Sequence, residues 1–94
     1  MRNITKQAVA ALLSKQNFRS ANTTVKQTDT GARLYLHGNL IAINEDVLYI
    51  TNAGWFSNTT KERLNGLPNV SIQQKQGEWY LNGKKWDGKL SKID

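Results

Sequence analysis

The sequence contains no cysteine and only one histidine, His37. The absence of cysteine excludes disulfides and thiolate metal sites, so packing alone must hold the fold together. With a single histidine, any metal site would consist mainly of carboxylates, and the acidic residues form no cluster along the chain. We therefore expect neither a metal nor another cofactor.

Long apolar segments are also missing. No run approaches the roughly 18 residues of a membrane span, and the stretch AVAALL is too short and too polar at its flanks for a signal peptide. We expect a cytoplasmic protein with no membrane partner. Its 94 residues, 38% of them hydrophobic and 21% charged, are typical of one globular domain, which we place at residues 1–94.

Acidic residues are absent from the first 28 positions, which carry five of the chain's 13 basic residues. The remaining eight basic residues are balanced by all seven acidic ones, so the net charge of +6 arises near the N-terminus. This asymmetry favours a partner that is itself acidic.

Residues 5–16 are predicted to form a short amphipathic helix. Val9, Leu12 and Leu13 recur at the helical period, and the neighbouring alanines raise helix propensity. Phe18 follows this segment and is expected to enter the core where the chain turns.

A second helix is predicted at residues 58–67. Thr59 and Glu62 have the spacing of a capping box if Thr59 is the N-cap, and Ser57 or Asn58 could cap the helix in an earlier register. A glycine and a proline near its end are typical of a helix terminus.

Two aromatic residues precede this second helix. The glycine before Trp55 allows a tight bend, so we expect Trp55 to be buried between the sheet and the helix. Phe56 is expected to pack on the first helical turn. Leu64 and Leu67 are expected to face the sheet from the helix.

The segment between the two helices alternates between apolar and polar residues at the period of a strand. The loops are too short for parallel crossovers, so the pattern predicts a four-stranded antiparallel meander. Gly31 is available for positive φ in the first loop, and Gly38-Asn39 is typical of a two-residue turn. The predicted strands are residues 22–27, 33–37, 40–43 and 47–51.

After the second helix the sequence predicts a C-terminal hairpin. Asn82-Gly83 is the strongest hairpin signal in the chain, and we expect positive φ at both positions. A two-residue turn there places Trp79 opposite Trp86 on the paired strands. The predicted strands are residues 70–75, 78–81 and 84–86.

Leu90 and Ile93 belong either to an edge strand or to a loose tail. With two short helices and an otherwise strand-rich pattern, the fold class is α+β: an antiparallel sheet made of a meander plus a C-terminal hairpin, with two short helices.

Catalytic signatures are not evident. His37 is the only side chain that can act as a base near neutral pH, and no motif places a nucleophile on a strained turn beside it. Glu45 and Asp46 lie together in a predicted turn, and no glycine-rich loop could hold a phosphate. We expect a protein that is not an enzyme.

Two binding hypotheses remain. For a protein partner, the candidate residues are exposed strand positions: Arg33, Tyr35, Tyr80 and Lys85. For nucleic acid, basic residues would meet phosphates and hairpin aromatics would stack on bases, although Trp79 and Trp86 fit a core equally well. The nucleic-acid candidates are Arg2, Lys6, Lys15, Arg19, Lys26, Lys84 and Lys85. Their spread along the sequence favours the protein partner.

The segments YLHGNLIA, NAGW, SNTTKERLN and WYLNGKKWDG resemble a family of small, mostly uncharacterised proteins of tailed bacteriophages. The resemblance runs from about Phe18 and brings no catalytic or binding residues with it. Ala21 stands where a glycine is expected. The resemblance implies a non-enzymatic protein that binds and modulates or inhibits a host or bacterial defence protein in the infected cytoplasm. Nucleic-acid binding is the alternative, and the oligomeric state stays open.

Overall fold

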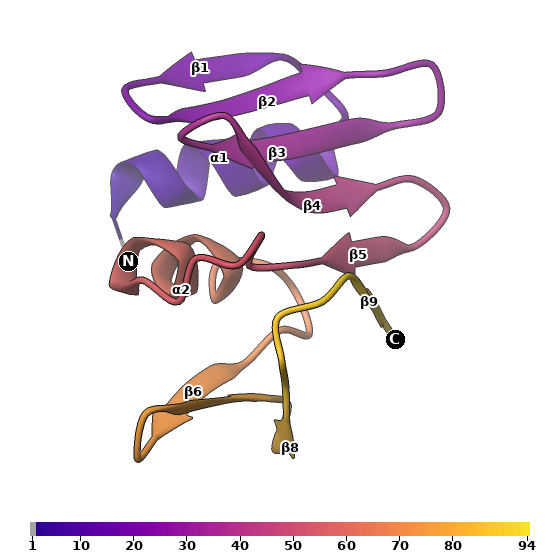
Figure 1. Cartoon of the computed structure of the whole chain (residues 1–94). Coiled ribbons are helices and arrows are strands. Elements are labelled where there is room, and N and C mark those ends of the chain that lie inside the picture. Colours follow the sequence, from indigo (N-terminus) through magenta and orange to yellow (C-terminus); the bar gives the residue numbers. More distant parts are fainter. Residues whose placement is uncertain (1) are drawn as a thin grey trace.

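The computed structural model describes residues 2–94. Helix α1 (Asn3–Leu13) precedes five strands, and a shorter helix α2 (Asn58–Leu64) precedes four more (Figure 1). The strands are β1 (Phe18–Ser20), β2 (Thr23–Gln27), β3 (Ala32–Leu36), β4 (Asn39–Asn44), β5 (Leu48–Ile50), β6 (Ile72–Lys75), β7 (Glu78–Leu81), β8 (Lys84–Lys85) and β9 (Ser91–Ile93).

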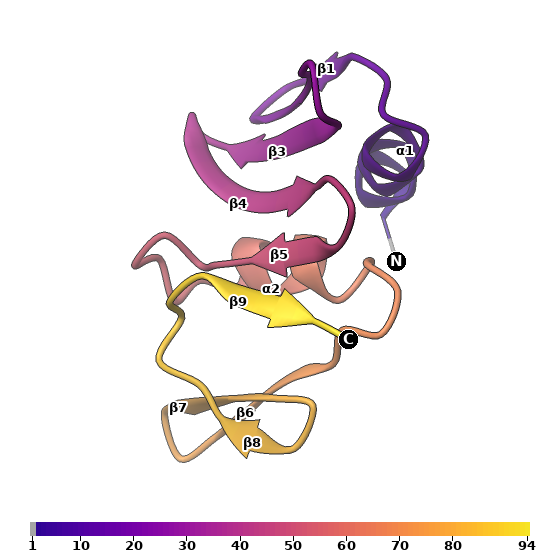
Figure 2. The ribbon, with the colours of Figure 1, turned by 90° about the vertical axis from the view of Figure 1, so that its right-hand side faces the viewer.

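The larger sheet has six antiparallel strands in the order β1-β2-β3-β4-β5-β9. Helix α1 packs across one side of it, where Leu12, Val25, Leu34 and Ile50 are buried (Figures 1 and 2). The predicted meander is therefore confirmed, with β1 added at one edge and β9 at the other. The C-terminal segment is an edge strand rather than a loose tail, because Leu48 pairs with Ile93.

The smaller sheet contains β6, β7 and β8. Asn82 and Gly83 have φ of 51° and 87°, which confirms the predicted turn. The Trp79 and Trp86 rings stack with centroids 6.3 Å apart. The backbone N–H of Trp86 donates to the backbone carbonyl oxygen of Trp79 over 2.9 Å. Because Trp79 is 2% and Trp86 8% exposed, these rings form core and are not a stacking surface.

Two turn assignments are corrected by the structure. The β3–β4 turn consists of His37 and Gly38, with φ of 52° and 80°, and Asn39 already belongs to β4. Gly31 is required by a close approach instead of by positive φ. A Cβ atom there would lie 1.9 Å from the backbone oxygen of Asn44.

Both helices are shifted from their predicted bounds. Helix α1 begins and ends earlier than residues 5–16, and its end is set by Lys15, which adopts a φ of 58°. Leu13 is exposed and does not belong to the buried face of the helix. Helix α2 is capped by Ser57, whose Oγ accepts from the Thr60 N–H over 3.2 Å, so the alternative cap at Ser57 is confirmed and the Thr59 cap is wrong. None of the helices in the described part is long and apolar enough to cross a membrane.

A buried arginine joins the two helices to the sheet. Arg63 on α2 is 2% exposed and donates from Nη1 to Thr5 Oγ1 over 2.8 Å and from Nε to Thr23 Oγ1 over 3.1 Å. Glu62 pairs with the same guanidinium and accepts from Thr5, so its predicted role in a capping box is wrong. Leu64 and Leu67 are buried as predicted.

Candidate functional site

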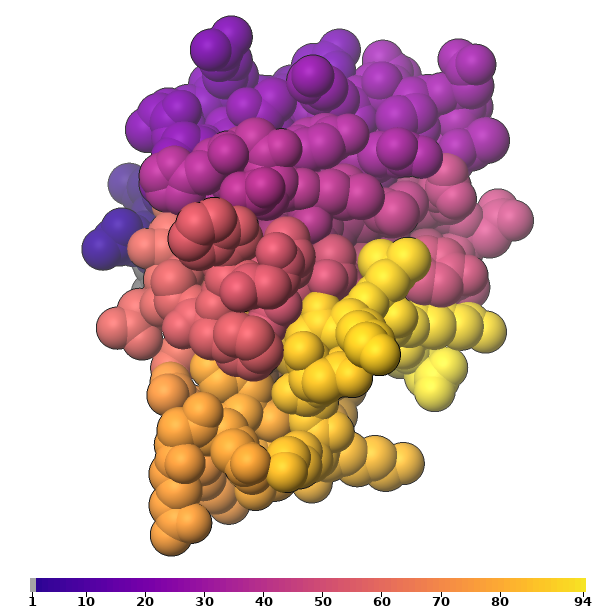
Figure 3. All heavy atoms as spheres, viewed as in Figure 1, coloured from indigo at the N-terminus to yellow at the C-terminus, as the bar shows by residue number. Residues whose placement is uncertain are grey.

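The side of the six-stranded sheet opposite α1 carries no helix. Figure 2 shows α1 on one side only, and Figure 3 shows the other side, where atoms of the strand region from about residue 20 to residue 50 are at the surface. Residues paired across antiparallel strands share a face. We call this side the open face. One row consists of Lys26, Arg33, Ile43, Tyr49 and Lys92, and a second of Arg19, Thr24, Tyr35 and Leu40.

The open face is positively charged and contains no carboxylate. Lys26 on β2 lies directly opposite Arg33 on β3, and Arg19 and Lys92 extend the charge to both edge strands. Within residues 2–94 none of these four cations forms an ion pair. Like charges placed opposite one another destabilise a sheet, so the arrangement is unfavourable for the pairing of β2 with β3.

Aromatic and aliphatic side chains lie between these cations. Tyr35 and Tyr49 are half-buried, as are Leu40 and Ile43, so each offers part of its surface to a ligand. The Lys26 Nζ atom lies 5.5 Å from the centroid of the Tyr35 ring. The open face can therefore combine charge attraction with stacking on flat rings.

The structure brings together four of the residues that the sequence pointed to: Arg19, Lys26, Arg33 and Tyr35. The other candidates are placed elsewhere. Tyr49 and Lys92 were missed. The alternation in residues 47–51 could have identified Tyr49, but only the pairing of β5 with β9 places Lys92. The residues off the open face are Arg2, Lys6 and Lys15 at α1, and Tyr80, Lys84 and Lys85 on the smaller sheet.

Lys85 is further set apart by its partner. Its Nζ atom lies 3.0 Å from Glu78 Oε1, and this hydrogen bond and the nearby charge raise the pKa of Lys85 above its ordinary value of 10.5. The lysine stays charged, but the carboxylate balances it. Lys85 is thus a weaker attractor of anions than the unpaired cations of the open face.

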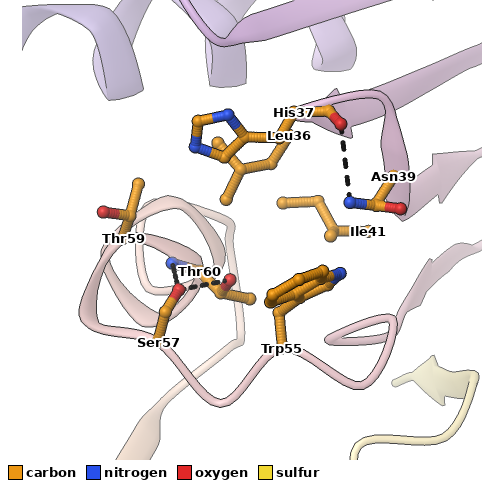
Figure 4. Close-up of a pocket in the computed structure, with 8 residues that line it drawn as sticks. All are labelled: Leu36, His37, Asn39, Ile41, Trp55, Ser57, Thr59 and Thr60. Atoms are coloured by element: carbon orange, nitrogen blue, oxygen red, sulfur yellow. Dashed lines mark hydrogen bonds between the residues drawn. The ribbon is translucent and has the colours of Figure 1, made fainter.

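A hollow of ≈ 280 Å³ lies between the β3–β4 turn, the loop after β5 and the start of α2 (Figure 4). Its apolar lining comes from Leu36 and Ile41 on the sheet and from the Trp55 ring, which lies on the other side of the hollow in the lower part of the view. We call this the Trp55 hollow. The remaining lining residues carry polar groups and are His37, Asn39, Ser57, Thr59 and Thr60.

The expected burial of Trp55 is wrong, because Trp55 is 60% exposed. Asn52 is the buried residue instead. Its backbone N–H donates to the backbone oxygen of Gly88 over 3.0 Å, and the backbone N–H of Trp55 donates to the backbone oxygen of Asn52 over 2.8 Å. These bonds tie the loop to the C-terminal segment and turn the indole outward. Phe56 is 55% exposed and packs edge-on against Trp79, with centroids 5.1 Å apart, and not on the first helical turn.

The polar groups of the Trp55 hollow form no activated nucleophile. Ser57 Oγ lies 2.9 Å from Thr60 Oγ1, and the His37 Nε2 atom lies 3.3 Å from the Asn22 amide nitrogen. No hydrogen bond joins His37 to a hydroxyl in the described part of the chain, whereas nucleophilic catalysis needs such a pair. The geometry is suited to holding a ligand.

Comparison with known proteins gives one family. Residues 1–92 match the family described as Kyanoviridae Gp96 protein, a cyanophage protein family. No curated protein and no solved structure matches the chain. The phage character implied by the sequence resemblance is confirmed by this match, which spans nearly the whole chain. The chain belongs to the Kyanoviridae Gp96 protein family.

Proposed function

We propose that this phage protein is a non-enzymatic binding protein whose open face holds single-stranded nucleic acid. The observation that carries the proposal is the set of four cations, Arg19, Lys26, Arg33 and Lys92, on a face without a carboxylate or a covering helix. Unpaired cations bind phosphates and release the counterions of the strand, which favours association.

The tyrosines of the open face favour a single strand over a duplex. Tyr35 and Tyr49 each present part of a ring between the cations, and every base has a face that can stack on such a ring. In a duplex the base faces are already stacked, and sequence is read by an element that enters a groove. A sheet face of half-buried tyrosines offers no such element, so it is better suited to unpaired bases.

A protein partner is the second candidate. Arginine and tyrosine are common anchors of protein interfaces, and Arg33 and Tyr35 both lie on the open face. An acidic surface of a host or defence protein, which the phage protein would inhibit or modulate, could meet the same cations. Tyr80 and Lys85 lie on the other sheet, so they would not belong to this contact. In either case we propose action in the cytoplasm of the infected bacterium.

The test compares cations on and off the open face. The double variant Lys26→Gln/Arg33→Gln removes two charges from the face, and the control Lys6→Gln/Lys84→Gln removes two exposed charges elsewhere. Binding of a labelled single strand of about 12 nucleotides, within the usual site sizes, is measured at several salt concentrations. We expect the face variant to bind more weakly, with the slope of log K against log salt flatter by about 0.7 per lost phosphate contact.

The control should bind as the wild type does, and a duplex of the same sequence should bind more weakly than the single strand. Equal losses in both double variants would mean that net charge alone drives binding, which contradicts a site. Failure to bind any strand, combined with specific capture of an acidic bacterial protein that depends on Arg33, would favour the second candidate.

A further inference from the structure

We infer that the Trp55 hollow is a subsite for one unstacked nucleobase, with the indole ring as its stacking platform. The inference rests on the proposed function, because it places a particular group of the bound nucleic acid. It concerns residues that are not on the open face, and it is tested separately below.

The Trp55 hollow adjoins the open face along the β3–β4 hairpin. Tyr35 and Leu40 are paired on the open face close to the β3–β4 turn, and His37 and Asn39 at this turn line the hollow. Leu36 follows Tyr35 directly and therefore points to the opposite, buried face of the strand. Figures 1 and 2 both show the loop after β5 on the side of the sheet opposite α1. A strand that follows the row from Arg19 to Leu40 would therefore reach the hollow by passing the β3–β4 turn.

The lining combines an apolar floor with polar groups that are still available. Within residues 2–94, the Thr59 hydroxyl and the Asn39 side-chain oxygen have no hydrogen-bond partner. The His37 ring contacts Asn22 through one nitrogen only. These groups include donors and acceptors, which is the combination needed for the edge of a base splayed out of a strand.

Size and aromatic exposure agree with such an occupant. At ≈ 280 Å³ the hollow is slightly smaller than the pockets of about 300–1,000 Å³ that hold drug-sized ligands, so one planar group is a better match than a larger molecule. In the described part of the chain Trp55 has no aromatic partner, unlike Phe56, Trp79 and Trp86. Its ring is thus free to stack on a ligand.

The experiment uses the fluorescence of the full-length protein. Trp55 is the only exposed tryptophan of the three, since Trp79 and Trp86 are buried, so quenching by a stacked base reports mainly on Trp55. The probes are a thymidylate strand of about 12 nucleotides, the same strand with central abasic sites, and thymidine monophosphate. The abasic strand keeps its phosphates and therefore keeps its attraction to the open face.

We expect the intact strand to quench Trp55 and the abasic strand to bind with little quenching. The variant Trp55→Leu should lose affinity for the intact strand by about 5- to 150-fold, which corresponds to the loss of one stacked base. It should bind the abasic strand as the wild type does, and Trp55→Tyr should restore much of the loss. Leu90→Ala, a change of another exposed apolar residue outside the hollow, should have no effect on either strand.

Quenching by the strand alone would identify a base held within a chain, whereas equal quenching by thymidine monophosphate would identify a free nucleotide as the ligand. Both outcomes support a base subsite. The inference is overturned if Trp55→Leu binds the intact strand as the wild type does. It is also overturned if the substitution abolishes binding to a bacterial protein and leaves binding to the strand unchanged.

The two proposals fail in distinguishable ways. If strands bind, the Lys26→Gln/Arg33→Gln variant binds them more weakly, and the fluorescence of Trp55 does not change, only the subsite is wrong. If no strand binds with salt dependence, the open face is wrong as a nucleic-acid site, and quenching by thymidine monophosphate still tests the hollow by itself.

Discussion

Lys26 and Arg33 face each other on β2 and β3, and none of the described residues in the two rows of the open face is acidic. An opposite charge at either position would stabilise the strand pair. The cation pair therefore lowers the stability of the sheet locally, and binding of an anion to the pair would offset this loss.

This relationship predicts opposite effects of one substitution on stability and on binding. Lys26→Glu should form an ion pair with Arg33 across the strands and raise the free energy of unfolding by about 0.2–1 kcal/mol. The same variant should bind single strands much more weakly. Denaturant unfolding and strand binding measure the two effects, and a variant that is stabilised but binds normally would show that the pair has no part in binding.

Trp55→Ala should leave the free energy of unfolding nearly unchanged, within about 0.5 kcal/mol, because the ring is mostly exposed. Trp79→Ala is the matched comparison. It removes a buried ring from the smaller sheet and should destabilise by about 3–5 kcal/mol. Urea unfolding of both variants checks this, and similar losses in the two would mean that Trp55 is buried in solution.

Arg63→Ala should destabilise the protein strongly. The guanidinium is buried and bonded to Thr5, Thr23 and Glu62, so its removal leaves Glu62 without its partner and two hydroxyls without their donor. Breaking a buried pair typically destabilises by about 3–5 kcal/mol. Arg33→Ala, at an exposed position, should change the unfolding free energy by less than about 0.5 kcal/mol. Comparable unfolding midpoints for the two variants would contradict this assignment.

Ala21→Gly should stabilise the protein. Ala21 has a φ of 50°, in the left-handed region, where a Cβ atom is unfavourable by about 1–2 kcal/mol. Part of this gain is offset by about 0.4–1 kcal/mol, because glycine gives the unfolded chain more freedom. Differential scanning calorimetry should show a rise in Tm of a few degrees, whereas the control Ala10→Gly, in helix α1, should lower it.

Gly83→Val should destabilise by about 1–2 kcal/mol, because Gly83 has a φ of 87° and a β-branched side chain tolerates that conformation badly. No heavy atom lies within 4 Å of the position a Cβ would take, so the effect is conformational and not a clash. Gly83→Asn is the control and should lose less, since asparagine adopts positive φ more readily. Equal thermal stability of the valine variant and the wild type would disprove the strain.

Sequence patterns predicted the elements that depend on nearby residues. The alternation of Leu34 and Leu36 with Arg33 and Tyr35 indicated which side of β3 is buried, and Asn82-Gly83 indicated the hairpin. The outward position of Trp55 depends on the hydrogen bond between Asn52 and Gly88, which are far apart in the chain. No local pattern contains that contact.

The candidate site was predictable only in pieces for the same reason. The alternation of side chains along the strand predicted that Arg33 and Tyr35 point outward. The excess of basic residues near the N-terminus identified Arg19 and Lys26 as candidates. That these residues share an uncovered face with Lys92 follows from the order of six strands and from the placement of α1 on one side. The apparent spread of basic residues along the sequence therefore concealed a common surface.

The pairing of β5 with β9 has a consequence for the order in which the sheet is built. Until β9 has been synthesised and has paired, β5 is the outermost strand, and its free N–H and C=O groups can pair with another chain. The final three-residue strand covers this edge and delivers Lys92 to the open face in the same step. A variant that lacks β9 would thus lose one cation of the open face and would also tend to aggregate, so a single strand both protects the sheet edge and completes the proposed binding surface.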